Sequence, residues 1–367
     1  MAARSLNGLA RSCTVFAATQ CSGYSPLYEE LSLSIAADEA LLHLLAEAPK
    51  GQARPTLLLA AVHYLLLGGT EHPLGRFYPS IAGPKQGALE LGGAAGAFRG
   101  FCGEHGGELT ELIRRGHTQT NEIRRAAALV LALQEVERSF SSPIELIEIG
   151  ASAGLNLLYE QYGYTIGTKS LGDLDSKVHV AVAAEAQIET QLDIHVPMAS
   201  SKSGIDLAPI DIFSDNEVRW LRSFVWPELG DDAERLMAAI SIARAAPPLV
   251  TKGDALELLP GLLVSGSEDT VPVVFHSTLL TYLSRNERLR LFGLLADVGA
   301  QRPLAWIALE SPGLLAELGG LDLGLPSQAN SSFVLAAVIW SEGRRNDIAL
   351  AQVDSYGRWM RTLTTDQ

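Results

Sequence analysis

Residues 148–154 combine an acidic side chain with a turn of small residues, and this combination could hold a cationic ligand. Ile144 to Ile149 form a short apolar run, as expected of a strand buried on both faces. Gly150 to Gly154 read GASAG, and Leu155 to Tyr162 then has helical spacing. A strand, a glycine turn and a helix direct free backbone N–H groups toward one point. Glu148 lies two residues before the turn, where a carboxylate would repel a phosphate and attract an amine or a positive charge.

S-adenosylmethionine suits such a site, because it carries an ammonium and a sulfonium and no phosphate. The spacing Glu148-x-Gly150-x-Ser152-x-Gly154 resembles the first motif of class I methyltransferases, E/D-x-G-x-G-x-G, with serine in place of the middle glycine. The residues that we expect to bind this cofactor in the stretch are Glu148, Gly150, Ala151, Ser152, Gly154 and Asn156.

The same turn permits a second interpretation, because G-x-S-x-G is also the nucleophile elbow of α/β-hydrolases. His105-Gly106-Gly107 stands upstream, where an oxyanion loop could lie, and Asp254 and His276 follow Ser152 in the chain order of a catalytic triad. An elbow serine sits in the middle of a sheet, however, and about 140 residues without a clear strand precede this turn. A serine esterase therefore stays the alternative, beside a structural turn that binds nothing.

Two further acids follow expected strands. Residues 203–211 read SGIDLAPID and resemble the G-x-D-x-x-P segment at the second strand of many methyltransferases, whose acid accepts hydrogen bonds from the ribose. This resemblance assigns Asp206 to the ribose, with Glu185 as the alternative. Pro248 to Lys252 is an expected strand, and the resemblance places Asp254 and the adjacent Ala255 at the adenine amine. Open parallel sheets bind ligands at such carboxyl ends of strands.

His276 and Ser277 end an expected strand beside the position of methyl transfer. Because histidine titrates near neutral pH, His276 could act as a general base or contact the cofactor together with Ser277. Tyr282 is the second catalytic candidate. The alternative is a strand-end histidine whose hydrogen bonds are satisfied within the protein. The sequence lacks a D/N-P-P-Y motif, which disfavours methylation of adenine amino groups.

Composition excludes several classes of protein. The 367 residues carry 42 acidic and 28 basic side chains, a formal net charge of −14, which disfavours binding to a nucleic-acid backbone. No apolar run reaches the roughly 18 residues of a membrane span. Three cysteines without metal spacing favour a reduced, cytoplasmic protein with no metal site. We therefore expect a small-molecule substrate, while the oligomeric state stays open.

The order of elements predicts two domains. Residues 1–140 show helical patterns only, and they should form a helical cap domain. Residues 141–367 alternate strands and helices, which predicts a mostly parallel sheet that ends in an antiparallel pair, as in a Rossmann-like methyltransferase fold. An insertion around residues 163–200 contains two expected strands, Tyr164 to Gly167 and Lys177 to Glu185, which could form a hairpin.

The helical part contains candidates for the substrate pocket. Thr120 to Phe140 is a strong helix pattern, with Thr118 or Thr120 as its cap and Arg124 and Arg125 on its polar side. Polar groups beside apolar helices can bind a methyl acceptor, or they can be satisfied core residues and caps. The candidates are His63, Tyr78, Gln119, Asn121 and Glu122.

Nearly the whole chain resembles a bacterial family called domain of unknown function 2332. The matching segments include LLLAAVHYLLL (57–67), QTNE (119–122), IGASAGLNLL (149–158), GIDLAPID (204–211), GDALELLP (253–260) and VFHSTLLTYL (274–283). The resemblance implies a methyltransferase-like fold and no particular activity. A binding protein without catalysis on that fold is accordingly a third possible function.

Overall fold

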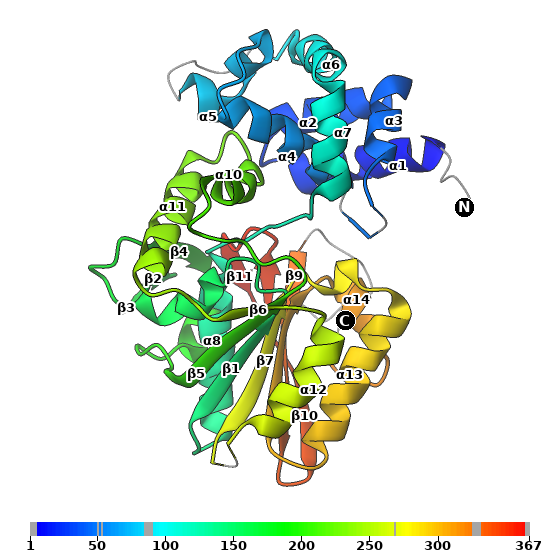
Figure 1. Cartoon of the computed structure of the whole chain (residues 1–367). Coiled ribbons are helices and arrows are strands. Elements are labelled where there is room, and N and C mark those ends of the chain that lie inside the picture. Colours follow the sequence, from blue (N-terminus) through cyan, green and yellow to red (C-terminus); the bar gives the residue numbers. More distant parts are fainter. Residues whose placement is uncertain are drawn as a thin grey trace. The chain divides into compact units, whose positions relative to one another are not determined.

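The structure is a computed structural model that describes residues 6–49, 51–52, 54–83, 91–267, 269–324 and 332–363 (Figure 1). The chain divides into two compact units, and the division is discontinuous in sequence. A helical unit comprises residues 1–120 and 213–234, and a sheet unit comprises residues 121–212 and 235–367. The sequence suggested a single boundary at residue 140, which misses the helical segment inserted after residue 212.

The helical unit consists of short helices that bury apolar stripes against one another. Its elements are α1 (Leu6–Phe16), the π-helical turn η1 (Ala17–Cys21), α2 (Pro26–Ala36), α3 (Glu39–Ala46), α4 (Arg54–Leu67), the 3-10 helix η2 (Pro73–Phe77), α5 (Pro79–Ala82), α6 (Ala94–Glu104), α7 (Gly106–Arg115), α10 (Asp215–Ser223) and the first residues of α11 (Gly230–Ala245). The expected single helix from Ser25 to Ala48 is two helices. Asp38 separates them, because its carboxylate accepts hydrogen bonds from the amides of Ala40 and Leu41 and so starts α3.

The sheet unit contains an eleven-stranded sheet in the order β3-β2-β4-β11-β10-β9-β8-β7-β1-β5-β6. The strands are β1 (Ile144–Ile149), β2 (Gly163–Ile166), β3 (Lys169–Gly172), β4 (His179–Ala184), β5 (Ala199–Asp206), β6 (Val250–Lys252), β7 (Val271–Ser277), β8 (Leu304–Glu310), β9 (Ser332–Ser341), β10 (Arg344–Asp354) and β11 (Trp359–Arg361). The remaining helices are α8 (Arg125–Ser139), η3 (Leu155–Gln161), α9 (Ala186–Gln191), α12 (Ala255–Ser265), η4 (Leu280–Tyr282), α13 (Arg285–Gly299) and α14 (Pro312–Ala316).

Five neighbouring strands, β6-β5-β1-β7-β8, are parallel, and β9 and β10 follow in antiparallel pairing. This confirms the expected α/β class with a mostly parallel sheet. From β1, the chain continues to β5 and β6 on one side of the sheet. From β7, on the other side of β1, it continues outward to β8. The strand order therefore reverses between β1 and β7, and open sheets of this kind bind ligands at such a point, beyond the carboxyl ends of the strands.

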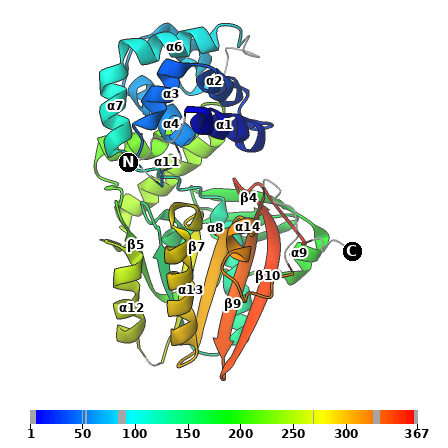
Figure 2. The same ribbon diagram turned by 90° about the vertical axis from the view of Figure 1, so that its right-hand side faces the viewer.

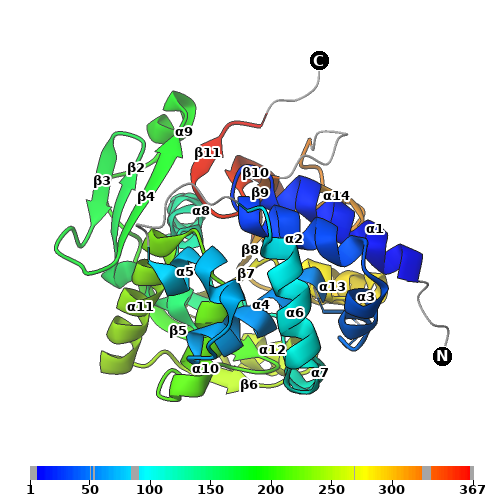
Figure 3. The same cartoon turned by 90° about the horizontal axis from the view of Figure 1, so that it is seen from above.

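The insertion forms a small lobe beside β11 (Figure 3). The expected pairing of its strands as a hairpin is wrong, because β2 and β4 run parallel. The hairpin partner of β2 is β3, a four-residue strand that the sequence analysis missed. β4 in turn pairs with β11, so the last described strand joins the lobe to the main sheet.

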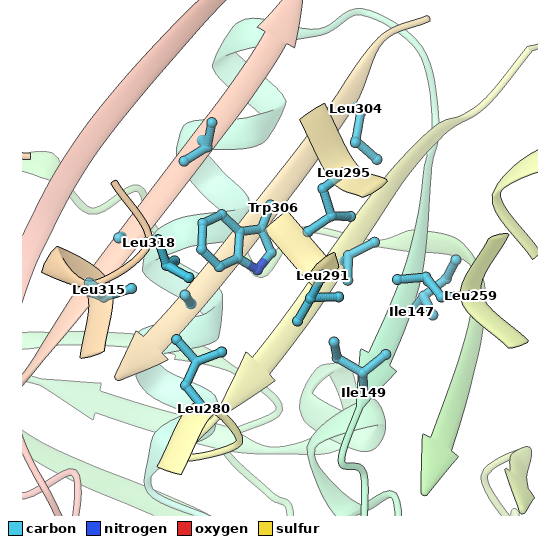
Figure 4. Close-up of a cluster of buried hydrophobic side chains, with 14 of the residues drawn as sticks. Ile147, Ile149, Leu259, Leu280, Leu291, Leu295, Leu304, Trp306, Leu315 and Leu318 are labelled. Atoms are coloured by element: carbon cyan, nitrogen blue, oxygen red, sulfur yellow. The ribbon is translucent and has the colours of Figure 1, made fainter. Parts of the chain in front are cut away.

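The two faces of the sheet are covered by different helices (Figures 1 and 2). α12 and α13 cover one face, where Trp306 lies in a cluster with Ile147, Ile149 and Leu291 (Figure 4). We call this the α13 face. The opposite face is covered by α8, which packs on β8 and β9, and we call it the α8 face. Among the described residues, no helix is long and apolar enough to cross a bilayer.

Candidate functional site

The turn after β1 is fixed to the end of the neighbouring strand β5. The amides of Gly150 and Ala151 both donate to the Ile205 carbonyl, at 2.8 and 3.2 Å, and the amide of Ile210 donates to the Ser152 carbonyl. Gly150, Ser152 and Gly154 have positive φ angles of 74°, 54° and 69°. Glycine adopts such angles without steric cost, whereas Ser152 must be held there by its surroundings.

Asp206 provides part of that support. Its Oδ2 accepts a hydrogen bond from the Ser152 amide at 2.7 Å, and its Oδ1 accepts from the Ala208 amide at 2.8 Å. The carboxylate, at the last residue of β5, therefore joins the glycine turn to the loop that follows β5. Each oxygen has a second lone pair, so the group can also accept from a ligand.

Glu148 is almost completely buried, with 2% of its surface exposed. Its Oε1 accepts a hydrogen bond from Asn156 Nδ2 at 2.9 Å, and its Oε2 has no partner among the described atoms. Burial raises the pKa of Glu148 to about 8, against the smaller opposing effect of the Asn156 hydrogen bond. A buried carboxyl with an unpartnered oxygen is costly, and a positively charged ligand would offset that cost.

Three other buried polar atoms near the turn also lack partners among the described residues. Asn121 Nδ2 donates to the Ala151 carbonyl at 3.2 Å, which leaves Asn121 Oδ1 without a partner, and Asn156 Oδ1 and Ser152 Oγ are likewise unpaired. The amide orientations follow from chemistry, because a carbonyl or a carboxylate accepts and so requires the NH₂ group. We call Glu148 Oε2, Asn156 Oδ1, Asn121 Oδ1 and Ser152 Oγ the acceptor cluster. It is suited to a ligand rich in N–H and O–H donors.

Asp254 lies at the same edge of the sheet but in a different setting. Asp206 is opposite Lys252 in the β5–β6 pairing, and Asp254 follows two residues later, so the two acids end neighbouring strands. Asp254 is exposed, and its Oδ1 caps α12 by accepting from the Leu256 amide at 2.8 Å, with Ala255 as the first helical residue. It is thus placed for an exposed contact, apart from the buried Glu148.

Glu185, the alternative to Asp206, is not near the turn. It follows β4, which is separated from β1 by five strands in the sheet, and its Oε2 accepts hydrogen bonds from the amide and hydroxyl of Thr362. Of the two acids, only Asp206 stands beside the turn.

His276 is fully buried and belongs to the α13 face. Neighbouring strands place Glu148 opposite Phe275, so Glu148 and Phe275 point to one face and His276 points to the other. His276 packs on Trp306, and its Nδ1 lies 2.9 Å from Oε1 of the buried Glu310. The same oxygen accepts from the amides of Leu279 and Leu280. The pair therefore holds the loop after β7, on the face away from the acceptor cluster.

The triad in chain order Ser152, Asp254, His276 is not formed. Asp254 caps a helix, and the carboxylate that pairs with His276 is Glu310. Tyr282, the second catalytic candidate, is half-buried in η4, the short helix of that same loop.

Arg125 was expected on the polar side of a helix, and this is wrong. It is 7% exposed, on the α8 face, and its guanidinium donates to the Ser355 carbonyl, Ser277 Oγ and Thr278 Oγ1. Helix α8 begins at Arg125, so the expected caps Thr118 and Thr120 are also wrong. Residues 116–122 are not helical, which frees Asn121 to reach the glycine turn.

The other substrate candidates are divided between the units. His63 is a satisfied core residue of the helical unit, bonded to the Ser223 carbonyl and Ser80 Oγ, and burial lowers its pKa to about 4. Tyr78 is completely buried beside it, and Gln119 is buried in the same unit. Asn121 and Glu122 belong to the sheet unit, where Glu122 Oε1 accepts from the Arg124 amide. Of this set, the structure brings Asn121 to the candidate site.

Fold and site together define a mixed α/β protein with an acid-bearing glycine turn at the reversal point of a mostly parallel sheet. The family model described as "Uncharacterized protein conserved in bacteria (DUF2332)" matches residues 10–362. The chain belongs to this family. None of the curated proteins matches it.

Proposed function

We propose that this protein binds S-adenosylmethionine at the carboxyl edge of the sheet and transfers its methyl group to a small-molecule acceptor. The observation that carries the proposal is the unpartnered Oε2 of the buried Glu148, together with the other unpaired atoms of the acceptor cluster on and beside the glycine turn. Such a group of unpaired acceptors favours a ligand with an ammonium group and disfavours a phosphate.

The arrangement of the sheet supports the same proposal. The five parallel strands can be numbered 1 to 5 in chain order, as β1, β5, β6, β7 and β8. Their spatial order across the sheet is then 3-2-1-4-5, which is the order of Rossmann-like sheets. Glu148, Asp206 and Asp254 end or follow the first three of them. We therefore infer a Rossmann-like methyltransferase fold for the sheet unit.

Each acid has a distinct role in this proposal. S-adenosylmethionine supplies a methyl group that its sulfonium has already activated, so the protein mainly positions donor and acceptor. Glu148 holds the ammonium, Asp206 accepts from the ribose hydroxyls, and Asp254 accepts from the adenine amine. Leu207, 63% exposed directly after Asp206, offers an apolar surface for the adenine ring.

Replacing Asp206 with asparagine should weaken the binding of S-adenosylhomocysteine by roughly 10- to 100-fold, because one charged acceptor of the ribose is lost. The matched control is Glu160→Gln at the other end of β5, where Glu160 accepts from the Ala199 amide at 2.8 Å. Glu160 lies in η3, so this control removes a carboxylate that contacts the far end of the same strand, and it should leave the affinity unchanged. Isothermal titration calorimetry measures both constants, and thermal unfolding checks that both variants are folded.

Equal affinities for the wild type and the folded Asp206 variant would remove Asp206 from the site. Absence of any binding by the wild-type protein would contradict the proposed function itself. Binding without methyl release to a panel of small nucleophiles would favour the binding protein on a methyltransferase fold.

A serine esterase is the second candidate, and the positive φ angle of Ser152 with its unpartnered hydroxyl favours it. The histidine of the expected triad lies on the α13 face, bound to Glu310, which opposes it. We expect a fluorophosphonate probe to label the wild type no more than Ser152→Ala, as measured by intact-protein mass spectrometry. Labelling of the wild type alone would establish the esterase.

A further inference from the structure

Arg125 is a buried cation on the α8 face, and all four described hydrogen bonds of its guanidinium go to neutral oxygens. Two reach the Ser355 carbonyl, at 3.3 and 2.9 Å, and two reach Ser277 Oγ and Thr278 Oγ1, at 3.1 and 2.9 Å. Burial lowers the pKa of Arg125, and the electrostatic effects of Glu122, Tyr356, Glu310 and Tyr282 oppose that shift. A guanidinium has five N–H groups, so one on Nη2 is left for a further acceptor.

Ser277, the last residue of β7, adds a second hydrogen-bond donor to this site. Among the described contacts its hydroxyl oxygen accepts from Arg125 and does not donate, so the hydroxyl proton is available to a ligand. Thr278 differs, because its hydroxyl donates to the Ser277 carbonyl at 2.7 Å. Ser277 is half-buried, and Thr278 has a positive φ of 56°, a strained backbone of the kind found at ligand sites.

The donor site and the acceptor cluster lie on one face at neighbouring strand ends. Phe275 is opposite Glu148, and Ser277 is two residues farther along β7 and on the same face. With strands about 4.8 Å apart and a rise of about 3.3 Å per residue, the Cα atoms of Glu148 and Ser277 are roughly 8 Å apart. An acceptor-rich group and a donor-rich group at this spacing match the two charges of one α-amino acid.

We propose that the two groups form a clamp for the amino-acid end of the ligand, with the ammonium at the acceptor cluster and the carboxylate at Arg125 and Ser277. The inference rests on the proposed function, because it assigns the amino-acid end of S-adenosylmethionine. It adds a requirement for the carboxylate, which the acids at the strand ends do not impose. Arg125 and Ser277 thereby become specificity-determining residues that separate the intact ligand from forms without a carboxylate.

Calorimetry with three ligands tests the clamp in the full-length wild-type protein. The ligands are S-adenosylmethionine, its decarboxylated form, which keeps the amine and sulfonium, and 5′-methylthioadenosine, which lacks the whole amino-acid end. Charge-assisted hydrogen bonds predict roughly 10- to 100-fold weaker binding of the decarboxylated form than of S-adenosylmethionine. Equal affinities for those two ligands would overturn the clamp and leave nucleoside binding intact. If none of the three binds, the proposed function fails as well.

Variants locate the effect. Arg125→Gln should weaken the binding of S-adenosylmethionine by roughly 10- to 100-fold and change the affinity for 5′-methylthioadenosine by no more than about twofold. Arg138→Gln is the matched control on the same helix, because Arg138 is exposed and pairs with Glu135 and Asp193. It should change neither affinity. An equal loss for both ligands in the Arg125 variant would contradict a role at the carboxylate.

Arg125 also holds the Ser355 carbonyl, so its removal could prevent folding. Ser277→Ala keeps that contact and removes the hydroxyl, which is the donor proposed for the ligand and also one acceptor of Arg125 Nη1. It should lower the preference for S-adenosylmethionine over the decarboxylated form by about 3- to 10-fold. An unchanged preference would exclude Ser277 from the clamp. The comparison of ligands in the wild-type protein tests whether the carboxylate is bound at all, and it needs no variant.

Discussion

Replacing Glu148 with glutamine should make the ligand-free protein more stable at pH 8 and at the same time weaken its binding of S-adenosylhomocysteine by roughly 100-fold. The pKa of Glu148 is raised from 4.5 to about 8 in the folded state, chiefly by burial. Between these values the folded protein binds more protons than the unfolded chain, so the free energy of unfolding falls as the pH rises. The cost is absent below pH 4.5 and grows to roughly 5 kcal/mol at pH 8 and above.

Glutamine has the same shape, keeps an acceptor for Asn156 and does not ionise. We therefore expect the stabilities of the variant and wild type to be similar at pH 5 and the variant to be more stable by about 2–4 kcal/mol at pH 8. Urea unfolding at a series of pH values measures this difference. Glu145→Gln on the same strand is the control, because Glu145 is half-buried and should show no such divergence.

Ligand affinity should rise with pH over the range in which the stability of the ligand-free protein falls, because both depend on the ionisation of Glu148. A cationic ligand requires the ionised carboxylate, so the affinity of the wild type should rise up to tenfold per pH unit from pH 6 to about 8. Above that, the ligand amine itself loses its proton. The glutamine variant should bind roughly 100-fold more weakly near pH 8 and show no rise. A parallel pH dependence in variant and wild type would contradict the assignment of the ammonium to Glu148.

Gly154→Ala should destabilise the sheet unit by roughly 2–5 kcal/mol. Gly154 has a φ of +69°, and a Cβ atom there would lie 2.7 Å from Val250 Cγ2 and 2.9 Å from Pro248 Cγ. The left-handed backbone costs an alanine about 1–2 kcal/mol, and forcing a methyl group into packed neighbours costs about 1–3 kcal/mol more. Because these neighbours include a strand residue beside the site, the turn itself must shift.

The control for that substitution is Gly261→Ala, in α12, where a Cβ atom would meet nothing within 4 Å. Alanine is the better helix former by about 1 kcal/mol, so this variant should be as stable as the wild type or more stable. Thermal unfolding of the two variants measures the contrast. A Gly154 variant as stable as the wild type would show that the turn can relax without cost.

The sequence was informative wherever a residue acts through its own segment. The apolar run of β1, the two glycines and the acid before them predicted the strand and turn, and the structure confirms both. The short segment after the turn was expected to be helical, and it is a 3-10 helix, η3. Asp206 was correctly placed at a strand end, because its local pattern alone determines that position.

Residues that act through distant parts of the chain were not predictable in this way. Arg125 donates to Ser277 and Ser355, more than 150 and 200 positions away, and an arginine at a helix start is usually exposed. Glu310 was not recognised as the partner of His276. The sequence pattern predicts where the strand of His276 ends, but it does not predict which side chain of the neighbouring strand β8 contacts the histidine. The inserted segment 213–234 likewise belongs to the helical unit through contacts such as Ser25 with Glu228, far apart in sequence.

The hydrogen bond from the Ser152 amide to Asp206 has a consequence for how tightly a ligand can be held. Together with the bonds of Gly150 and Ala151 to Ile205, it makes the turn and the end of β5 one preorganised body. Little conformational entropy then remains to be lost when a small molecule binds. The free energy of its contacts is therefore reduced only slightly by the cost of ordering the protein.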